Sequence, residues 1–299
     1  MKKKFLFPTL AIIALIIFAF SQKQTSQQSK KIVLQKDGIT LSEAENFYDF
    51  PNATLKMNSP ANSSNLDTGK TKFSYTVENY QLGNQTPDAD MKLCANSAKG
   101  QHIHLILNNE PYSAWYTPDF EVNLNPGHYV ALSFLSRSYH ESIKTKKAYT
   151  LTQFTVGKPI GLDTVDCQTQ TPLKWDQTFF ARFQDGKSYP YHVDLTEPML
   201  FYSRPKGTYV GGKEIKKLLL DFYLVNTDLS ENGNKVKATI NGTEFILTKW
   251  VPYFIEGLPM GKNKIKLELI NNEGKPIYGH YKTSGERTFE LAEDEPIKK

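Results

Sequence analysis

The chain has 299 residues, a formal net charge of +5 and 12% aromatic residues. A hydrophobic content of 39% is enough to build a core and excludes a largely disordered protein, while a mean hydropathy of −0.47 excludes a multi-span membrane protein. Two cysteines are too few for a disulfide-dense scaffold. At roughly 100–200 residues per domain, the length predicts about two domains.

The N-terminus has the pattern of an export signal. Lys2–Lys4 precede an uncharged apolar stretch, Phe5–Phe20, and the small residues Ala19 and Ser21 stand at positions −3 and −1 of a cleavage site. The alternative is an uncleaved anchor, for which a stretch interrupted by Pro8 is short. We therefore predict a signal peptide or anchor over 1–21 and an exported protein, in the periplasm or on the outer surface. Membrane contact is expected only through residues 5–20, if they are retained.

The charge of the mature chain excludes nucleic acid as a partner. Removal of Lys2–Lys4 leaves 33 basic against 31 acidic residues, so the exported chain is near neutral at +2. Only four of the basic residues are arginines and they are scattered, whereas a nucleic-acid-binding protein needs a clustered basic face. Residues 22–45 begin with a Gln- and Ser-rich stretch and are predicted to be a polar spacer.

The rest of the chain predicts an all-β fold. Short β-branched and aromatic segments, several with alternating polarity, are separated by turn signals such as Asn108-Asn109, Pro126-Gly127 and Asn241-Gly242. The clearest predicted strands are Thr71–Val77, His102–Leu107, Tyr129–Leu135, Lys235–Ile240 and Lys264–Ile270.

The second half of the chain repeats the first. Residues 102–135 match residues 235–270 at an offset of 133 to 135, and residues 77–82 match residues 224–229 at an offset of 147. The matched pairs are Leu107 and Ile240, Asn108 and Asn241, Trp115 and Trp250, Pro118 and Pro252, Phe120 and Phe254, Leu124 and Leu258, and Gly127 and Gly261. The change of offset places an insertion near residues 86–100 of the first copy.

This duplication predicts two tandem immunoglobulin-like antiparallel β-sandwich domains, over 46–158 and 195–292. Residues 159–194 have no counterpart in the repeat and are predicted to be a connector with a possible hairpin. Residues 293–299 form a charged tail.

Residues that differ between the copies are the better candidates for a binding surface. Trp115 and Trp250 resemble a sugar-binding platform, but residues shared by both copies are better explained as common core. The unmatched aromatic and histidine side chains are predicted to line a ligand-binding surface of the first sandwich. They are Tyr112, Tyr116, Tyr139 and His140.

Alternating histidines suggest a metal site. His102 and His104 are two residues apart on a strand, so both side chains point to one face, and imidazole is a common ligand of copper and zinc. His128 is the candidate third ligand, and His140, Met91 and Cys94 are further residues from which such a site could be assembled. The pair matches Lys235 and Lys237 in the second copy, which predicts that both histidines face solvent. The alternative is an exposed histidine pair without a function. No other cofactor is predicted.

The two cysteines allow one disulfide. Cys94 lies in the insertion and Cys167 in the connector, and in an exported protein such a pair favours a bridge. The alternative is two isolated buried thiols. None of the patterns GxSxG, HExxH, GxGxxG or the P-loop occurs, and we predict that the protein is not an enzyme.

Three strings resemble a family of uncharacterised bacterial exported proteins that often carry the label "phosphopeptide-binding protein". They are GQHIHLILNNEPYSAWY from Gly100, FYSRPKGTYVGG from Phe201 and VKATINGTEFILTKWVPYFIEGLPMGKNKIKLEL from Val236. The resemblance covers most of residues 50–290 and implies no catalytic residues. If the label holds for this chain, the cationic turn with Arg204 and Lys206 is the expected phosphate contact.

Taken together, the sequence predicts a non-catalytic envelope protein that binds a partner protein or a small ligand mainly through its first sandwich. A metal-binding envelope protein using His102 and His104 is one alternative. A phosphopeptide-binding module is the other.

Overall fold

A computed structural model describes residues 31, 33–45, 49–158, 161–164, 179–182, 188–190 and 193–293. The predicted signal or anchor therefore lies outside the described residues, as does the charged tail after Glu293. Among the described residues, no helix is long and apolar enough to cross a membrane. The only helical turn in this part of the chain is the 3₁₀ turn η1, Ala89–Met91, within the predicted insertion.

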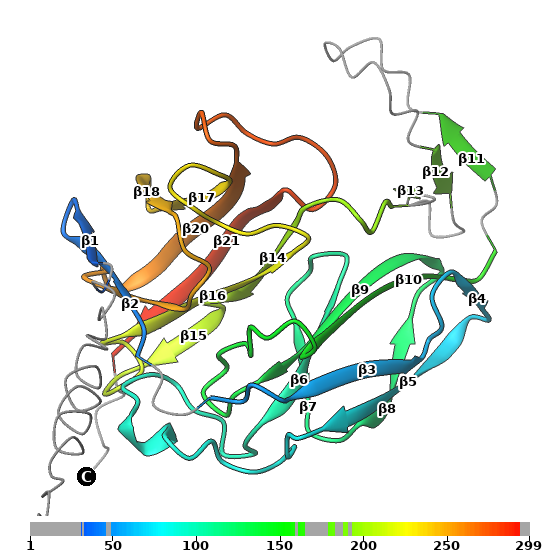
Figure 1. Ribbon diagram of the computed structural model, residues 1–299, viewed down its shortest axis with the longest axis horizontal. Coiled ribbons are helices and arrows are strands. Elements are labelled where there is room, and N and C mark those ends of the chain that lie inside the picture. Colours follow the sequence, from blue (N-terminus) through cyan, green and yellow to red (C-terminus); the bar gives the residue numbers. More distant parts are fainter. Residues whose placement is uncertain are drawn as a thin grey trace, which may run out of the picture. The chain divides into compact units, whose positions relative to one another are not determined.

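The first sandwich pairs a three-stranded sheet with a five-stranded sheet (Figure 1). The smaller sheet has the order β3-β5-β8, with bounds Thr54–Ser59, Gly69–Glu78 and Asp119–Leu124. The larger has the order β4-β10-β9-β6-β7, with bounds Ser64–Leu66, Tyr149–Val156, Gly127–Ser136, His102–Leu107 and Ser113–Trp115. Phe73, Ile103, Leu105 and Phe154 are buried in the core between the two sheets.

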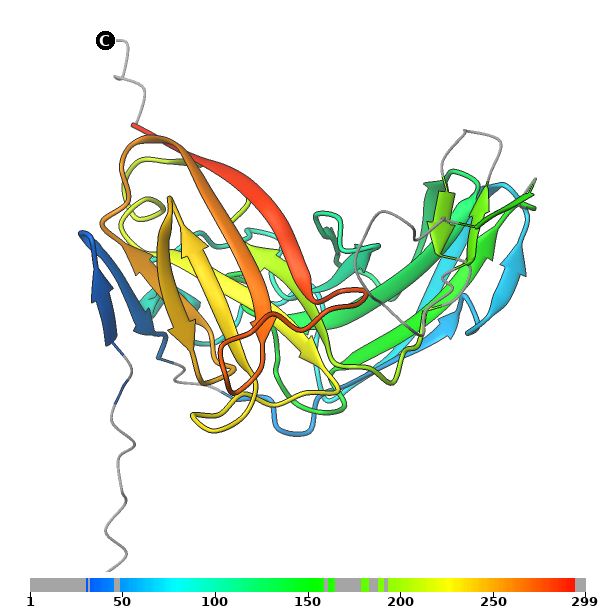
Figure 2. The same cartoon turned by 90° about the horizontal axis from the view of Figure 1, so that it is seen from above.

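The second sandwich repeats this arrangement, and Figure 2 shows its strands β17, β20 and β21 side by side in yellow, orange and red. One sheet has the order β15-β21-β20-β17-β18, with bounds Gly207–Val210, Thr283–Ala292, Gly261–Ile270, Lys235–Ile240 and Thr243–Leu247. The other contains β14, β16 and β19, with bounds Met199–Arg204, Leu218–Val225 and Tyr253–Glu256. The fold is therefore two immunoglobulin-like antiparallel β-sandwiches, as predicted.

The topology agrees with the repeat seen in the sequence. β6 corresponds to β17, β9 to β20 and β10 to β21, and in each copy a short strand joins the large sheet in parallel, β4 on β10 and β15 on β21. Asn79 and Asn226 have φ of 56°, and Asn108 and Asn241 have φ of 52° and 48°. Asparagine tolerates this left-handed backbone, which explains why both copies have it at the same turns.

The two matched tryptophans are partly buried. Trp115 stacks on Phe120 with ring centres 3.9 Å apart, and Trp250 donates from Nε1 to the carbonyl of Phe222. Both contacts are with residues of the folded domains, in line with a packing role for this pair.

The segment predicted as a polar spacer contains structure. β1, Val33–Lys36, and β2, Ile39–Glu43, form a hairpin, and β2 pairs with β19, so the second sandwich gains two strands from the N-terminal side. The turn Asp37-Gly38 has positive φ at both residues, and Ile39 and Leu41 are buried. An Asp-Gly pair followed by alternating apolar residues is a strong hairpin signal, and the spacer prediction overlooked it.

The connector also contains strands. β11, β12 and β13 form a three-stranded antiparallel sheet, with bounds Gly161–Thr164, Phe179–Arg182 and Ser188–Pro190. The remaining residues between 159 and 192 lie outside the described part of the chain.

A second apolar core joins the large sheet of the first sandwich to β14 and β16 of the second. Val130, Leu132 and Phe134 of β9 share one buried cluster with Phe201 and Tyr223. Both faces of the large sheet are therefore covered, one by the sandwich's own core and one by the other sandwich. β6 is an inner strand of this sheet, between β9 and β7, and all of its residues before Leu107 are buried.

Candidate metal centre

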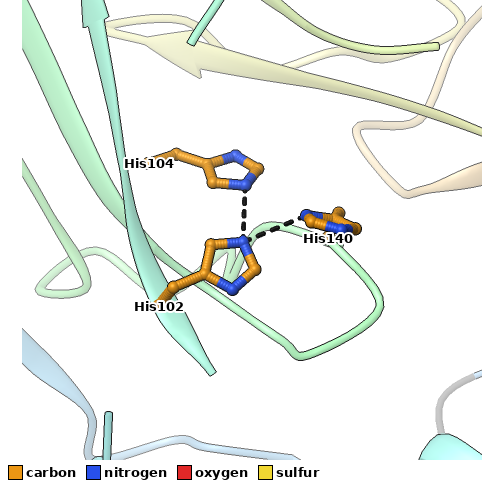
Figure 3. A group of neighbouring side chains, drawn as sticks. All are labelled: His102, His104 and His140. Atoms are coloured by element: carbon orange, nitrogen blue, oxygen red, sulfur yellow. Dashed lines mark hydrogen bonds between the residues drawn. The ribbon is translucent and has the colours of Figure 1, made fainter. Parts of the chain in front are cut away.

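Three imidazole rings meet beside β6 (Figure 3). His102 and His104 come from this strand, and His140 comes from the turn that follows β9. His102 Nε2 lies 2.8 Å from His104 Nε2 and 3.1 Å from His140 Nδ1. All three potential ligand nitrogens lie within 4.8 Å of one another.

The two strand histidines are buried, so the prediction that they face solvent is wrong. His102 and His104 are 0% exposed. Their counterpart strand β17 alternates between buried and half-buried residues, and its Lys237 forms ion pairs with Glu244 and Glu268. The outer face of β6, in contrast, is covered by the second sandwich. The comparison of the two copies gave the wrong exposure for these histidines, because matched residues of the two copies need not lie on a sheet face that is covered in both.

His140 occupies a backbone position that favours glycine. Its φ is 66°, and the matching residue in the second copy is Gly274, with φ of 80°. The same hydrogen bonds close both turns: His140 N donates to Arg137 O and Gly274 N to Asn271 O. A histidine in this left-handed conformation costs roughly 1 kcal/mol relative to glycine. Such strain at one copy only points to a role for the side chain.

The hydrogen bonds of His102 orient its free nitrogen toward the cluster. Its Nδ1 lies 2.8 Å from the carbonyl of Gly100, which only accepts, so Nδ1 carries the proton and Nε2 presents a lone pair. Gly100 has φ of 83°, and a Cβ there would lie 2.5 Å from the carbonyl oxygens of Gly83 and Asn84. Only glycine fits at this position. The hydrogen bond from His102 Nδ1 to its carbonyl fixes the tautomer of the ring, and such a bond is typical of metal-binding histidines.

The three imidazoles are neutral near pH 7. Burial lowers the pKa of His102 to about 4, although the bond to Gly100 acts in the opposite direction. Burial also holds the pKa of His104 well below its usual range, and the pKa of His140 is lowered by burial and by the Arg204 guanidinium. Neutral imidazole is the form that binds metal ions, so metal binding needs no net loss of protons from these rings.

The same pKa values predict that the metal-free protein loses stability in acid. The unfolded chain takes up protons on histidine below pH 6.5 while the folded chain does not, so stability falls as the pH drops from 6.5 toward 4. For His102 alone the loss is about 3 kcal/mol by pH 4. Urea unfolding of chelator-treated protein at several pH values measures it. His102→Asn keeps a donor for Gly100 without titrating, and an unchanged pH slope in this variant would contradict the assignment.

The spacing of the nitrogens suits a metal ion. Tetrahedral coordination with metal–nitrogen bonds of about 2.0–2.1 Å places ligand atoms roughly 3.3 Å apart. The two short separations here, 2.8 and 3.1 Å, are close to that value, and small ring movements bring the third nitrogen in. In the metal-free protein His104 Nε2 donates to His102 Nε2, so metal binding requires the other tautomer of His104, with its proton on Nδ1, where Ser203 Oγ lies 3.4 Å away. A set of three imidazoles suits zinc or copper.

Three further predicted residues lie around this cluster. The Tyr112 ring stacks on His104 with centres 3.6 Å apart, and its Oη lies 3.4 Å from His140 Nδ1. Arg204 is buried; its Nε donates to Tyr112 Oη and its Nη1 to Tyr209 Oη. Lys206 Nζ donates to the backbone oxygen of Tyr112, and burial lowers the pKa of Lys206 to about 8. The cationic turn thus closes the site instead of presenting its guanidinium on the surface.

Other predicted residues lie elsewhere or at the edge of the site. His128, the predicted third ligand, is hydrogen-bonded to Gln153 and Thr155 at the opposite end of β9, and His140 takes its place. Tyr139 donates to Asp88 and packs against Ala89 and Cys94, outside the histidine cluster. The Tyr116 ring lies 5.0 Å from that of His102, but its hydroxyl is bonded to Ser97.

The structure describes only one of the two cysteines of the predicted disulfide. Cys94 is a buried free thiol in the structure, and burial raises the pKa of this thiol to about 12. Its predicted partner, Cys167, lies outside the described residues. The pairing stays a prediction.

The sequence suggests His140 beside His128 as a possible ligand but favours His128, and it does not indicate Gly100 and Ser203, which lie at hydrogen-bond distance from His102 and His104. One signal was available for His140. The offset of 134 that aligns Gly127 with Gly261 also aligns His140 with Gly274, so a histidine stands where the turn favours glycine. No sequence pattern pointed to Ser203, because it reaches the site only through the packing of the two sandwiches.

Comparisons with known proteins leave the function open. No family model matches the chain, and no curated protein matches it. Among solved structures, the chain is similar to the fibronectin(III)-like modules of Clostridium thermocellum CbhA, with 11% identity, a TM-score of 0.24, and coverage of 81% of this chain and 94% of that one. It is also similar to the Bacteroides ovatus mixed-linkage glucan utilization locus protein SGBP-B in complex with a heptasaccharide, with 10% identity, a TM-score of 0.21, and coverage of 81% and 71%.

The FN1–FN3 domains of chicken CNTN1 give similar values, with 10% identity, a TM-score of 0.23, and coverage of 81% and 66%. At these levels the likeness carries no argument about ligand or activity.

Proposed function

We propose that this protein is an exported, non-catalytic metal-binding protein whose first sandwich supplies three imidazole ligands and whose second sandwich closes the site. The observation that carries the proposal is the convergence of His102, His104 and His140 on one point, with ligand nitrogens within 4.8 Å. Export rests on the basic and apolar pattern of residues 1–21. The ligand expected for the first sandwich is thus a copper or zinc ion.

Three properties of the site favour this function over the alternatives. His102 and His104 are buried and His140 is half-buried, which limits access of water, and the rings are neutral, which suits metal binding. His140 keeps a backbone conformation that is unfavourable for its residue type. Phosphopeptide binding, in contrast, needs an accessible arginine fork, and Arg204 is buried against Tyr112 and Tyr209.

Calorimetric titration of chelator-treated protein, purified without a polyhistidine tag, tests the proposal. We expect one Cu²⁺ or Zn²⁺ per chain, with Cu²⁺ bound more tightly, as the general order of divalent affinities requires. His102→Asn should weaken binding by more than about 100-fold, since loss of a supporting residue alone costs about 10–100-fold.

The matched control is His128→Gln. His128 is also buried in the large sheet, but its bonds are to Gln153 and Thr155. This variant should bind metal like the unmodified protein. Absence of binding to the unmodified protein, or equal affinity after His102→Asn, would refute the proposed function.

A further inference from the structure

Tyr112 is the oxygen-bearing side chain that lies against two of the three imidazoles. It is 4% exposed, its ring stacks on His104, and its Oη is 3.4 Å from His140 Nδ1. That separation is close to the roughly 3.3 Å expected between two ligands of one tetrahedral ion. Tyr112 Oη and His140 Nδ1 are therefore about as far apart as two ligand atoms of one metal ion.

Two cationic side chains contact Tyr112. Arg204 Nε donates to Tyr112 Oη at 2.9 Å, and Lys206 Nζ lies 3.6 Å from the centre of the Tyr112 ring. Burial raises the pKa of the Tyr112 phenol and the Arg204 guanidinium acts to lower it, so the phenol is neutral in the metal-free protein. Within the described residues, Arg204 and Lys206 contact tyrosines and not a carboxylate.

One carboxylate lies near in strand register but is already engaged. Asp221 is opposite Arg204 across β14 and β16, yet its oxygens accept from Ser142 and Lys144. A divalent ion held by three neutral imidazoles would thus add two positive charges beside the buried Arg204 guanidinium and the half-buried Lys206 ammonium. Buried charges are stable only when they are compensated, so the occupied site requires an anion at this position.

We infer that Tyr112 is the fourth ligand of the metal ion and binds it as a phenolate. This rests on the proposed function. On binding, the Oη–H bond breaks, the proton passes to solvent or buffer, and the oxygen lone pair forms the bond to the metal, with no change of oxidation state. The resulting negative charge lies between the metal ion, the Arg204 guanidinium and the Lys206 ammonium, and compensates all three in part. Arg204 Nε remains a donor to the coordinated oxygen.

Visible absorption and resonance Raman spectra of the Cu²⁺-loaded protein test this assignment. Direct coordination should give a phenolate-to-copper charge-transfer band, with tyrosinate vibrations enhanced on excitation in that band. Tyr112→Phe retains the ring that stacks on His104 and should still bind one Cu²⁺ through the histidines, but without the band and about 10- to 100-fold more weakly.

Tyr116→Phe is the matched control. Its ring also lies beside His102, but its hydroxyl is bonded to Ser97, so the band should persist. Thermal unfolding of both variants checks that they are folded. Copper bound to the unmodified protein without the band, or a band that survives Tyr112→Phe, would overturn the assignment while leaving the metal site intact. Failure of the unmodified protein to bind either copper or zinc would overturn the proposed function and this inference together.

Discussion

Replacement of His140 by glycine should remove tight metal binding without unfolding the protein. The variant loses one of three imidazole ligands, so we expect affinity for Cu²⁺ or Zn²⁺ to fall by more than about 100-fold. A metal ion at 100 times its Kd stabilises the folded protein by about 2.7 kcal/mol, and the variant should lose this gain. Thermal unfolding with and without metal measures both effects.

The metal-free stability of the same variant should stay within about 1 kcal/mol of the unmodified protein. Glycine relieves the left-handed conformation at φ of 66°, a gain of roughly 1 kcal/mol. It also gives the unfolded chain more freedom, which costs about 0.4–1 kcal/mol, so the two effects nearly cancel. The second copy shows that this turn closes with glycine, since Gly274 makes the equivalent hydrogen bond.

His140→Ala is the matched control. Alanine removes the same ligand but keeps the unfavourable backbone and the smaller freedom of the unfolded chain, so this variant should lose metal binding and have a metal-free stability within about 1 kcal/mol of His140→Gly. If His140→Gly kept its metal affinity, His140 would not be a ligand. If it were much less stable than His140→Ala, the strain argument would fail.

The fold was largely predictable from local patterns. β6 and β17 have the predicted bounds, and the repeat anticipated two copies of one sheet order, because strand alternation and turn residues are local properties. The hairpin β1–β2 was missed although its Asp37-Gly38 turn was visible, since a polar composition was given more weight than the turn signal.

The site was predictable only in part. His102 and His104 were identified from their spacing, because residues two apart on a strand share a face. Their burial and the closing residues Ser203 and Arg204 depend on how one sandwich packs on the other, whereas His140 follows β9, the neighbour of β6 in the same sheet. Such packing joins residues about 100 positions apart and leaves no period in the sequence. Tyr112 was identified as unmatched, but its relation to Arg204 was not.

The turn that holds His140 depends on a buried carboxylate from the second sandwich, and Asp221→Ala should be strongly destabilising. Asp221 is 0% exposed and accepts from Ser142 Oγ at 2.8 Å, Ser142 N at 3.3 Å and Lys144 Nζ at 2.6 Å. Its removal leaves the largely buried Lys144 ammonium without this partner, and breaking a buried pair in this way costs about 3–5 kcal/mol. Urea unfolding measures the loss.

Glu286→Ala provides the matched control for this change. Its pair with Lys264 is also an ion pair with a separation of 2.8 Å, but both side chains are more than half exposed. Water screens such a pair, so the cost should be at most about 1 kcal/mol. Equal losses for Asp221→Ala and Glu286→Ala would contradict the claim that burial decides the energy.

A second substitution separates two contributions to this loss of stability: the lost attraction between Asp221 and Lys144, and the cost of leaving the Lys144 charge buried without Asp221. If most of the cost of Asp221→Ala is the desolvated Lys144 ammonium, Lys144→Met in the same chain should recover a large part of it, because an apolar side chain has no charge to compensate. Ser142 N would still lack its acceptor, so recovery should be incomplete. Because His140 lies two residues before Ser142, both variants should also bind metal more weakly than the unmodified protein, even where stability is regained. Full stability with unchanged metal affinity in the double variant would show that this carboxylate does not position the turn.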